Sequence, residues 1–262
     1  MFVPELPDVE GFRRVLAEHA TGRPVQRVDV LDEGVLRGVT PRRFRERLRG
    51  CRFAEPRRHG KWLIVPTDGR PVLLAHFGMT GSLHWVPDGG EARHPHDRVV
   101  FVLPDGELRY RDMRKLQGLR LAADDEVEEA LGGLGPDAST VSRAQLRDLL
   151  AGVRRQVKPA LVDQSVLAGL GNLLADEILW RARIHPRRSC ADLTPDDLAR
   201  LHTAMREVLR RSVPTGRVPP RGSWLTGHRD ERPGACPRCG TTLCHGRVGG
   251  RGTAWCPRCQ PE

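Results

Sequence analysis

Long hydrophobic runs are missing from this chain of 262 residues, and aromatic residues make up only 5% of it. No segment approaches the roughly 20 consecutive apolar residues that a membrane-spanning helix needs. The first twenty residues carry Glu5, Asp8 and Glu10 and no apolar run, so they resemble neither a signal peptide nor a transit peptide. The sequence therefore predicts a cytoplasmic protein without a membrane partner.

Lysine is also scarce. Of the 43 basic residues only three are lysines, at Lys61, Lys115 and Lys158, and arginine supplies the rest. Basic residues outnumber the 33 acidic ones, which gives a formal net charge of +10. Because the excess is spread through segments that look folded, it predicts a polyanionic partner, nucleic acid before membrane. The alternative is a well-solvated surface with no such partner.

Only seven cysteines are present, and four of them form two CxxC pairs: Cys236, Cys239, Cys256 and Cys259. The pairs are separated by 16 residues, a short glycine-rich stretch typical of a two-stranded hairpin. Two such turns supply a closed tetrahedral set of thiolates for one structural Zn(II) ion. Cys244 and His245 are possible substitute ligands, but their spacing fits less well. Zinc ribbons bind DNA or protein partners, or only stabilise a chain end.

The pattern of hydrophobic residues predicts an α+β fold. A helix is expected over residues 5–20, short strands over 25–121, and a helix over 40–50 with Thr40 as its cap. Beyond an acidic, glycine-rich segment the pattern is helical, and in the last helix Thr194 caps and Leu198, Leu201, Met205, Val208 and Leu209 form the buried stripe. We expect three domains, at residues 1–130, 131–215 and 216–262.

Several motifs in a fixed order resemble one known family. They are "PELPDVE" near the start, "HFGMTGSL" from 76, "RDMRK" from 111, "LGPDA" from 134, the segment 158–186, and the terminal cysteine module. Together they resemble the bacterial family of formamidopyrimidine-DNA glycosylase and endonuclease VIII. The resemblance implies an amino-terminal β-sandwich, then a helix-two-turn-helix domain and a zinc-finger β-hairpin. It also implies a monomeric base-excision repair enzyme, associated with the nucleoid, whose two halves grip double-stranded DNA containing damaged bases or abasic sites.

The resemblance assigns catalytic roles at the start of the chain. Pro4 matches the amino-terminal proline whose amine attacks the sugar C1′ and forms a Schiff base, the step that gives glycosylase and AP lyase activity. Glu5 would transfer protons at the sugar ring or the leaving base. Lys61 would reach DNA phosphate and the damaged base. Taken alone, an early Pro-Glu pair is more typical of a helix start, and a lysine of a solvated surface.

Further positions match residues that bind DNA in the family. Lys158, Asn172 and Arg251 match phosphate contacts, and Met79 and Arg114 match side chains that fill the gap left by a flipped base. The remaining two are Leu116, which stands where an aromatic wedge is usual, and Glu177, which matches a carboxylate supporting the active site. For Glu177 the alternative is an ordinary exposed helix position.

Two departures from the family pattern bear on function. The connector between Ser212 and the zinc finger is shorter than in enzymes that recognise 8-oxoguanine, so we expect weak 8-oxoguanine removal and leave ring-opened purines and oxidised pyrimidines as candidate lesions. Pro4 is preceded by Met1, Phe2 and Val3, which block its amine. We expect that translation starts at Val3 and that processing then exposes Pro4. The alternative is a damaged-DNA-binding or monofunctional relative that retains the extension.

Overall fold

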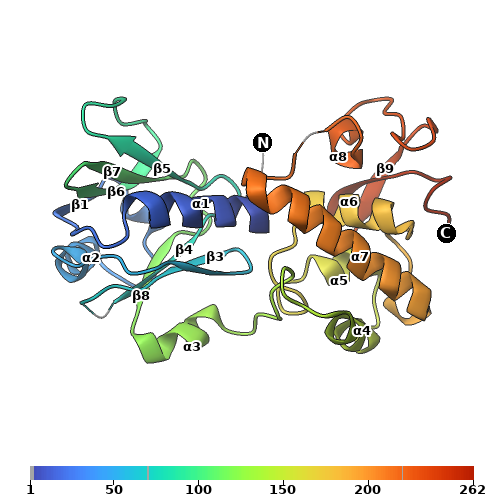
Figure 1. Cartoon of the computed structure of the whole chain (residues 1–262), viewed down its shortest axis with the longest axis horizontal. Coiled ribbons are helices and arrows are strands. Elements are labelled where there is room, and N and C mark those ends of the chain that lie inside the picture. The colour runs from blue at the N-terminus through green and yellow to red at the C-terminus, as the bar shows by residue number, and fades with distance from the viewer. Residues whose placement is uncertain (1–2, 70, 220) are drawn as a thin grey trace. The chain divides into compact units, whose positions relative to one another are not determined.

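The computed structural model describes residues 3–69, 71–219 and 221–262. The chain forms two compact units (Figure 1). The first holds the residues up to Pro4 together with Asp8–Gly132, and the second holds Glu5–Pro7 and Gly133–Glu262. Helix α1 (Leu6–His19), expected from the sequence, therefore begins in the second unit and continues in the first.

Two antiparallel four-stranded sheets build the first unit. One has the order β1 (Arg27–Val30), β6 (Asp97–Leu103), β7 (Gly106–Arg111), β5 (Ser82–Pro87). The other has the order β2 (Arg57–His59), β3 (Trp62–Val65), β4 (Val72–His76), β8 (Leu119–Ala122). One hydrophobic core contains Phe101 of the first sheet and Leu63 of the second. The predicted β-sandwich is confirmed.

Helices complete the first unit. Helix α2 (Pro41–Leu48) begins as predicted, with the Thr40 hydroxyl accepting a hydrogen bond from the Arg43 N–H. Its Phe44 and Leu48 side chains are buried in the sandwich core. The acidic segment after β8 forms a 3-10 turn (Asp124–Glu126) and helix α3 (Val127–Leu131).

The second unit is mainly helical, with α4 (Arg143–Ala151), α5 (Val157–Leu161), α6 (Asn172–Ala182) and α7 (Pro195–Ser212) around one core. Thr194 caps α7 as predicted. Leu201, Met205, Val208 and Leu209 of the expected stripe are buried, whereas Leu198 is only partly buried. Among the described residues, no helix has both the length and the apolar character required to cross a membrane.

The last segment contains the expected hairpin, with β9 (Cys244–Val248) and β10 (Arg251–Trp255) paired antiparallel around a Gly249–Gly250 turn. The connector before it also contains a helix, α8 (Leu225–His228), which the sequence pattern did not indicate. Trp224, just before α8, is fully buried in the core of the second unit. The α+β class is confirmed, while the separate domain that we place at 216–262 stays a prediction.

Candidate functional site

Glu5 caps the amino terminus of α6. Its side chain is buried, with Oε1 accepting a hydrogen bond from the Leu173 N–H at 2.8 Å. Oε2 accepts from the Gly171 N–H at 2.9 Å and the Leu174 N–H at 3.1 Å. A carboxylate satisfies N–H groups that have no partner inside a helix, and it complements the helix dipole. A Cβ on Gly171 would lie 2.3 Å from Glu5 Cδ, so only glycine leaves room for this carboxylate.

Pro4 is buried and lies one peptide bond before this cap. In the 262-residue chain its nitrogen forms the amide with Val3, so it has no free amine. Met1 and Phe2 of the predicted extension lie outside the described residues. The geometry therefore fixes the neighbour of the predicted nucleophile, and the role of Pro4 stays a prediction.

Lys61 lies in the two-residue turn Gly60–Lys61 that joins β2 to β3. Its charge acts on His76 at the end of β4: burial and then the Lys61 ammonium lower the pKa of His76 to about 4. His76 Nδ1 accepts a hydrogen bond from the Gly78 N–H at 3.0 Å. The Lys61 ammonium, in the turn before β3, thus acts on a largely buried imidazole at the end of the neighbouring strand β4.

The two predicted gap-filling side chains lie together. Arg114 Nη1 is 3.1 Å from Met79 Sδ, although the two residues are 35 positions apart. The buried Asp112 carboxylate connects their loops, because its Oδ1 accepts from Thr80 Oγ1 at 2.5 Å and from the Arg114 N–H at 3.1 Å. Met79 and Arg114 are neighbours in the structure, and their role in filling a gap in DNA stays a prediction. The sequence motifs did not single out Asp112, which connects them.

Leu116 projects from the same loop, and half of it is exposed. Arg37 holds the loop on both sides of Leu116 by donating to the carbonyls of Lys115 at 2.7 Å and Gln117 at 2.9 Å. Lys115 adopts a left-handed conformation with φ of 53°, and its ammonium bonds Asp32 at 2.8 Å. A rigid loop therefore presents an apolar side chain to solvent, as a wedge requires.

In the second unit, the structure brings the positions of two predicted phosphate contacts together. Asn172 is the first residue of α6, and its Nδ2 donates to the Gly252 carbonyl oxygen of β10 at 2.9 Å. Arg251, the residue before Gly252, is exposed. Asn172 Oδ1 is buried and has no hydrogen-bond partner among the residues that the structure describes.

Lys158, which the resemblance matches to a phosphate contact, lies in the interior of the second unit. Its side chain is fully buried, and its ammonium is 2.6 Å from Asp176 Oδ1 and 2.6 Å from Thr253 Oγ1. Burial lowers the pKa of Lys158 and raises that of Asp176, and the attraction between them opposes both shifts. In this structure Lys158 balances a buried carboxylate and offers no exposed ammonium to a phosphate.

Glu177 is fully buried, so the alternative of an exposed helix position is wrong. Its Oε1 accepts from Arg181 Nε at 2.8 Å, and its Oε2 accepts from the Thr226 N–H of α8 at 3.1 Å. Burial raises the pKa of this carboxyl group. Glu177 therefore binds the connector helix α8 to α6. Its predicted support of the active site stays a prediction.

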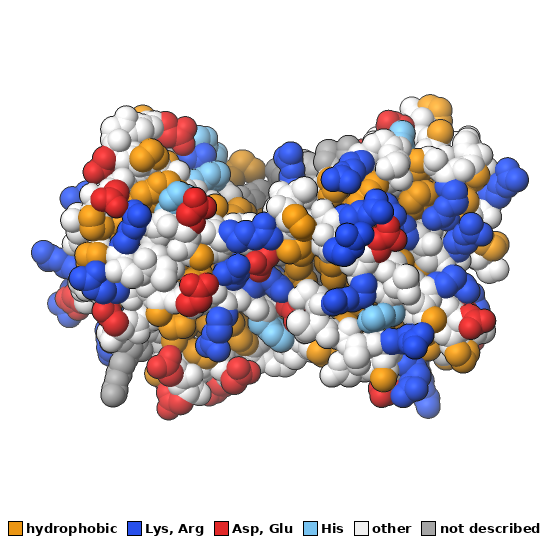
Figure 2. Space-filling model, viewed as in Figure 1, with side chains coloured by type: hydrophobic (Ala, Val, Ile, Leu, Met, Phe, Trp, Pro, Cys, Tyr) orange, Lys and Arg blue, Asp and Glu red, His pale blue; other side chains and the backbone are white. Residues whose placement is uncertain are grey.

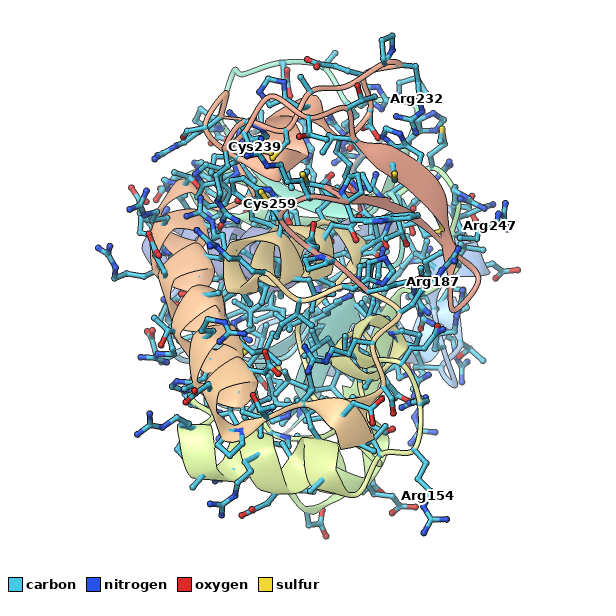
Figure 3. All side chains as sticks on the ribbon, turned by 90° about the vertical axis from the view of Figure 1, so that its right-hand side faces the viewer. Arg154, Arg187, Arg232, Cys239, Arg247 and Cys259 are labelled. Carbon is cyan, nitrogen blue, oxygen red and sulfur yellow. The ribbon has the colours of Figure 1, made fainter. Side chains whose placement is uncertain are left out.

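The sulfur atoms of the four cysteines of the CxxC pairs lie within 4.8 Å of one another: Cys236, Cys239, Cys256 and Cys259. Cys239 and Cys259 of this group are labelled in Figure 3. His245 lies outside this group, since its Nε2 is 3.0 Å from the Arg229 carbonyl oxygen and 2.6 Å from Arg232 Nη1. Trp180 Nε1 donates to Cys236 Sγ at 3.4 Å. Four thiols with a donor beside one of them fit a closed zinc site.

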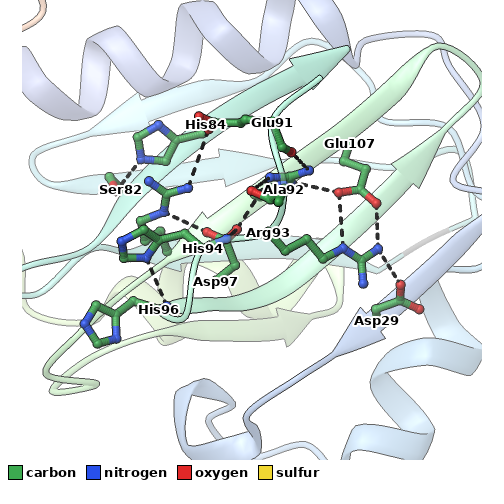
Figure 4. A network of polar contacts seen from close by, with 12 residues as sticks. Asp29, Ser82, His84, Glu91, Ala92, Arg93, His94, His96, Asp97 and Glu107 are labelled. Atoms are coloured by element: carbon green, nitrogen blue, oxygen red, sulfur yellow. Dashed lines mark hydrogen bonds and ion pairs between the residues drawn. The ribbon is translucent and has the colours of Figure 1, made fainter. Parts of the chain in front are cut away.

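Charged side chains also form a network in the first unit that the sequence did not indicate (Figure 4). The buried Asp97 accepts from Arg111 Nε at 2.7 Å and from the His94 N–H at 2.8 Å. Arg93 Nη2 bonds Glu107 at 2.6 Å and Asp29 at 2.8 Å. These bonds fasten the segment 91–97 to the sheet. On the face shown in Figure 2, lysine and arginine side chains are numerous on each unit.

Comparison with protein families gives three matches in order. Residues 3–119 match the N-terminal domain of formamidopyrimidine-DNA glycosylase, and residues 133–219 match its H2TH domain. Residues 235–261 match a zinc finger found in FPG and IleRS. The last match includes all four cysteines, which hold one structural zinc ion.

Whole-chain relatives agree with these matches. The chain is 38% identical to a formamidopyrimidine-DNA glycosylase of Symbiobacterium thermophilum, covering 99% of this chain and 90% of that protein. It is 39% identical to one of Moorella thermoacetica, covering 98% and 92%.

Solved structures of the Lactococcus lactis protein are similar along their whole length. A complex of a variant with Fapy-dG-containing DNA has a TM-score of 0.90 at 28% identity, covering 99% of this chain and 100% of that one. A complex with DNA containing an abasic site has a TM-score of 0.87 at 29% identity, covering 98% and 100%. Sequence, fold and cysteine geometry agree, and the chain belongs to the formamidopyrimidine-DNA glycosylase family.

Proposed function

We propose that this protein excises damaged bases from double-stranded DNA and cleaves the strand at the resulting abasic site. The observation that carries the proposal is the buried Glu5 carboxylate on the amino terminus of α6. Pro4, the predicted nucleophile, directly precedes Glu5 in the chain, so the contact with α6 supports a fixed position for the carboxylate beside it. The same helix terminus carries Asn172, a predicted phosphate contact.

The chemistry would begin at the amine of Pro4, once that residue is amino-terminal. Its nitrogen forms a bond with the sugar C1′ while the bond from C1′ to the base breaks, and the base leaves with a proton. Opening of the sugar ring gives an iminium at C1′. Loss of a proton from C2′ then expels the 3′ phosphate, and a second elimination expels the 5′ phosphate. Water hydrolyses the iminium and releases the enzyme.

Glu5 and Lys61 would assist these steps. The ring oxygen and the leaving base both require protons, and Glu5 is the carboxyl group nearest in sequence to the nucleophile. Glu5 accepts three backbone N–H bonds, and a carboxylate accepts such bonds more strongly than a protonated carboxyl group does, so proton uptake by Glu5 would weaken its contact with α6. Lys61, on the turn beside His76, would supply a positive charge to phosphate or the damaged base.

Binding would use separate residues on each unit. Asn172 and Arg251 would hold phosphates, and the adjacent Met79, Arg114 and Leu116 would fill the gap left by the flipped base. Lys158 would support these contacts from the interior of the second unit, where its ammonium bonds Asp176 and the Gly252 carbonyl oxygen. The zinc ion supplies structure alone, since four cysteines leave no open coordination position.

The candidate lesions are ring-opened purines and oxidised pyrimidines. The solved relatives include Lactococcus lactis complexes with Fapy-dG-containing DNA and with DNA containing an oxidised pyrimidine. The short connector of this chain supports weak removal of 8-oxoguanine. In a bacterial cell we place this activity on the DNA of the nucleoid.

The form of the chain that begins at Pro4 would be the active one. In support, the match to the family's N-terminal domain begins at residue 3, one position before Pro4. A start at Val3 would place methionine directly before proline, a context in which methionine is readily removed. Intact mass of the protein from its native host checks this, and retention of Met1, Phe2 and Val3 would contradict it.

Borohydride trapping tests the proposal directly. The 262-residue form and a form beginning at Pro4 are each incubated with DNA containing an abasic site and reduced with borohydride. The covalent protein–DNA complex is then quantified on a denaturing gel. Only the shorter form should be trapped. Trapping of both forms would implicate another amine. Trapping of neither, with binding intact, would leave the alternative of a damage-binding or monofunctional protein.

A further inference from the structure

One backbone carbonyl in the second unit accepts hydrogen bonds from three side chains. The Gly252 oxygen is 2.7 Å from Arg229 Nη2, 2.9 Å from Asn172 Nδ2 and 3.2 Å from Lys158 Nζ. A carbonyl oxygen has two lone pairs, and bonds from charged donors are stronger than those from neutral ones. The orientation of the peptide group at Gly252 is therefore tightly determined.

Two of the three donors are cations bound to one buried carboxylate. Asp176 is fully buried, with Oδ1 2.6 Å from Lys158 Nζ and Oδ2 2.8 Å from Arg229 Nε. Arg229 thus uses one edge of its guanidinium for Asp176 and another for Gly252. A buried carboxylate shared by two cations holds both of them in place.

The hairpin is fixed by further contacts around Gly252. Thr253 Oγ1 accepts from Lys158 Nζ at 2.6 Å and donates to the Arg251 carbonyl oxygen at 2.9 Å. At the turn, a Cβ on Gly249 would lie 2.5 Å from Pro159 Cγ, so the turn packs closely on α5. Arg251 lies between these anchors and is itself exposed.

We propose that Arg229, together with Asp176 and Lys158, is a positioning residue that fixes Arg251 relative to Asn172 so that both can hold DNA phosphate. Arg229 lies in the connector, outside the segments that match the family profiles. Only 13% of its side chain is exposed, which leaves it unsuited to bind phosphate itself. This inference rests on the proposed function, because it assigns a geometry to two of its predicted DNA contacts.

A double-mutant cycle on the full chain tests the inference. The probe is a duplex with one tetrahydrofuran abasic analogue, and binding is measured for the unchanged chain, R229K, R251A and the double variant. Lysine keeps a cation beside Asp176, but its side chain is shorter and its compact ammonium does not span Asp176 Oδ2 and the Gly252 oxygen as the forked guanidinium of Arg229 does. We expect R229K to weaken binding by about tenfold when Arg251 is present, and by less than about twofold in the R251A background.

Controls separate positioning from folding. R210A removes an exposed arginine of α7 and should leave binding unchanged. Zinc content and melting temperature are measured for every variant. If R229K loses zinc, R229Q replaces it in the cycle, because glutamine keeps an uncharged amide donor group.

The outcomes are distinguishable. Equal weakening by R229K in both backgrounds, or no weakening in either, would overturn the positioning role. Full binding by R251A would also overturn it, because Arg251 would then have no phosphate to hold. If the unchanged chain does not prefer abasic to undamaged duplex, the proposed function itself fails.

Discussion

At the scale of single residues, Gly171 has a steric role beside Glu5. Its backbone N–H bonds Glu5, and any Cβ would overlap the Glu5 carboxyl group. We expect Gly171→Ala to displace Glu5 from α6, with a cost of about 1–3 kcal/mol in unfolding free energy. Trapping by the form beginning at Pro4 should fall at least about tenfold, because a small displacement of a reacting group is costly.

A matched glycine provides the control for this prediction. Gly222 has open space where a Cβ would stand, so Gly222→Ala should leave both stability and trapping close to those of the unchanged chain. Urea unfolding and the borohydride assay measure the two quantities. Unchanged trapping by Gly171→Ala would show that the Glu5 contact has no part in the reaction.

His76 should make stability depend on pH. Its pKa is about 4 in the folded chain and 6.5 as a free group, so the unfolded chain binds the proton more readily. The contribution of neutral His76 to the free energy of unfolding is therefore complete above pH 6.5 and is lost as the pH falls through the folded pKa of about 4. The loss should reach about 3 kcal/mol, since each pKa unit corresponds to about 1.4 kcal/mol.

Urea unfolding at pH 7 and pH 4.5 measures this loss for the unchanged chain and for His76→Gln. Glutamine keeps a hydrogen-bond acceptor for Gly78 without a titrating ring, so its pH dependence should be smaller by most of that amount. His19, which is stacked on Trp85, offers a control histidine in His19→Gln. An equal change in unfolding free energy between pH 7 and pH 4.5 for the unchanged chain and His76→Gln would contradict the prediction.

Two of the three lysines show what sequence could predict at this scale. The family motif located Lys61 and Lys158, yet Lys158 is buried against Asp176 from the same unit. That ion pair joins α5 to α6, and Thr253 comes from a strand 95 residues away. Periodicity and motifs describe neighbours in sequence, so they give no sign of such distant partners.

At the scale of elements, most helices and strands follow from local pattern. Capped helices such as α2 and α7 could be predicted because Thr40, Thr194 and the prolines after them act locally. Helix α8 could not, since four residues carry no periodicity. It is held from outside by Glu177, which bonds the Thr226 N–H, and by the burial of Leu225.

The zinc hairpin should be required for DNA binding. Arg251 is at the start of β10. The four cysteines lie before β9 and after β10, so removal of the metal breaks the link between the two ends of the hairpin. We expect Cys259→Ser, or treatment with a strong chelator, to lower affinity for abasic duplex at least about tenfold, because structural zinc supplies folding free energy.

Zinc content, intrinsic tryptophan fluorescence and DNA affinity check this together. Cys51→Ser is the matched control, since Cys51 lies in the first unit and its thiol donates to the Arg47 carbonyl, a bond that serine can also make. Full affinity in a metal-free protein would contradict a structural role for zinc in binding.

At the scale of the whole molecule, the net charge of +10 predicts how binding responds to salt. Each phosphate that the protein neutralises releases condensed cations, so log Kd should rise with log salt concentration by about 0.9 per contact. Arginines on an exposed surface contribute to this slope only where they meet phosphate. The slope therefore separates a DNA-binding surface from one that is merely well solvated.

Arg251 should account for about one unit of that slope. We expect R251A to weaken binding and to flatten the plot of log Kd against log salt concentration by about 1, measured on an abasic duplex by fluorescence anisotropy. R210A should leave the slope unchanged, because the same charge is removed from an exposed position on α7. Equal slopes for R251A and the unchanged chain would exclude a phosphate contact at Arg251, and a flat response for all variants would exclude electrostatic binding of the duplex.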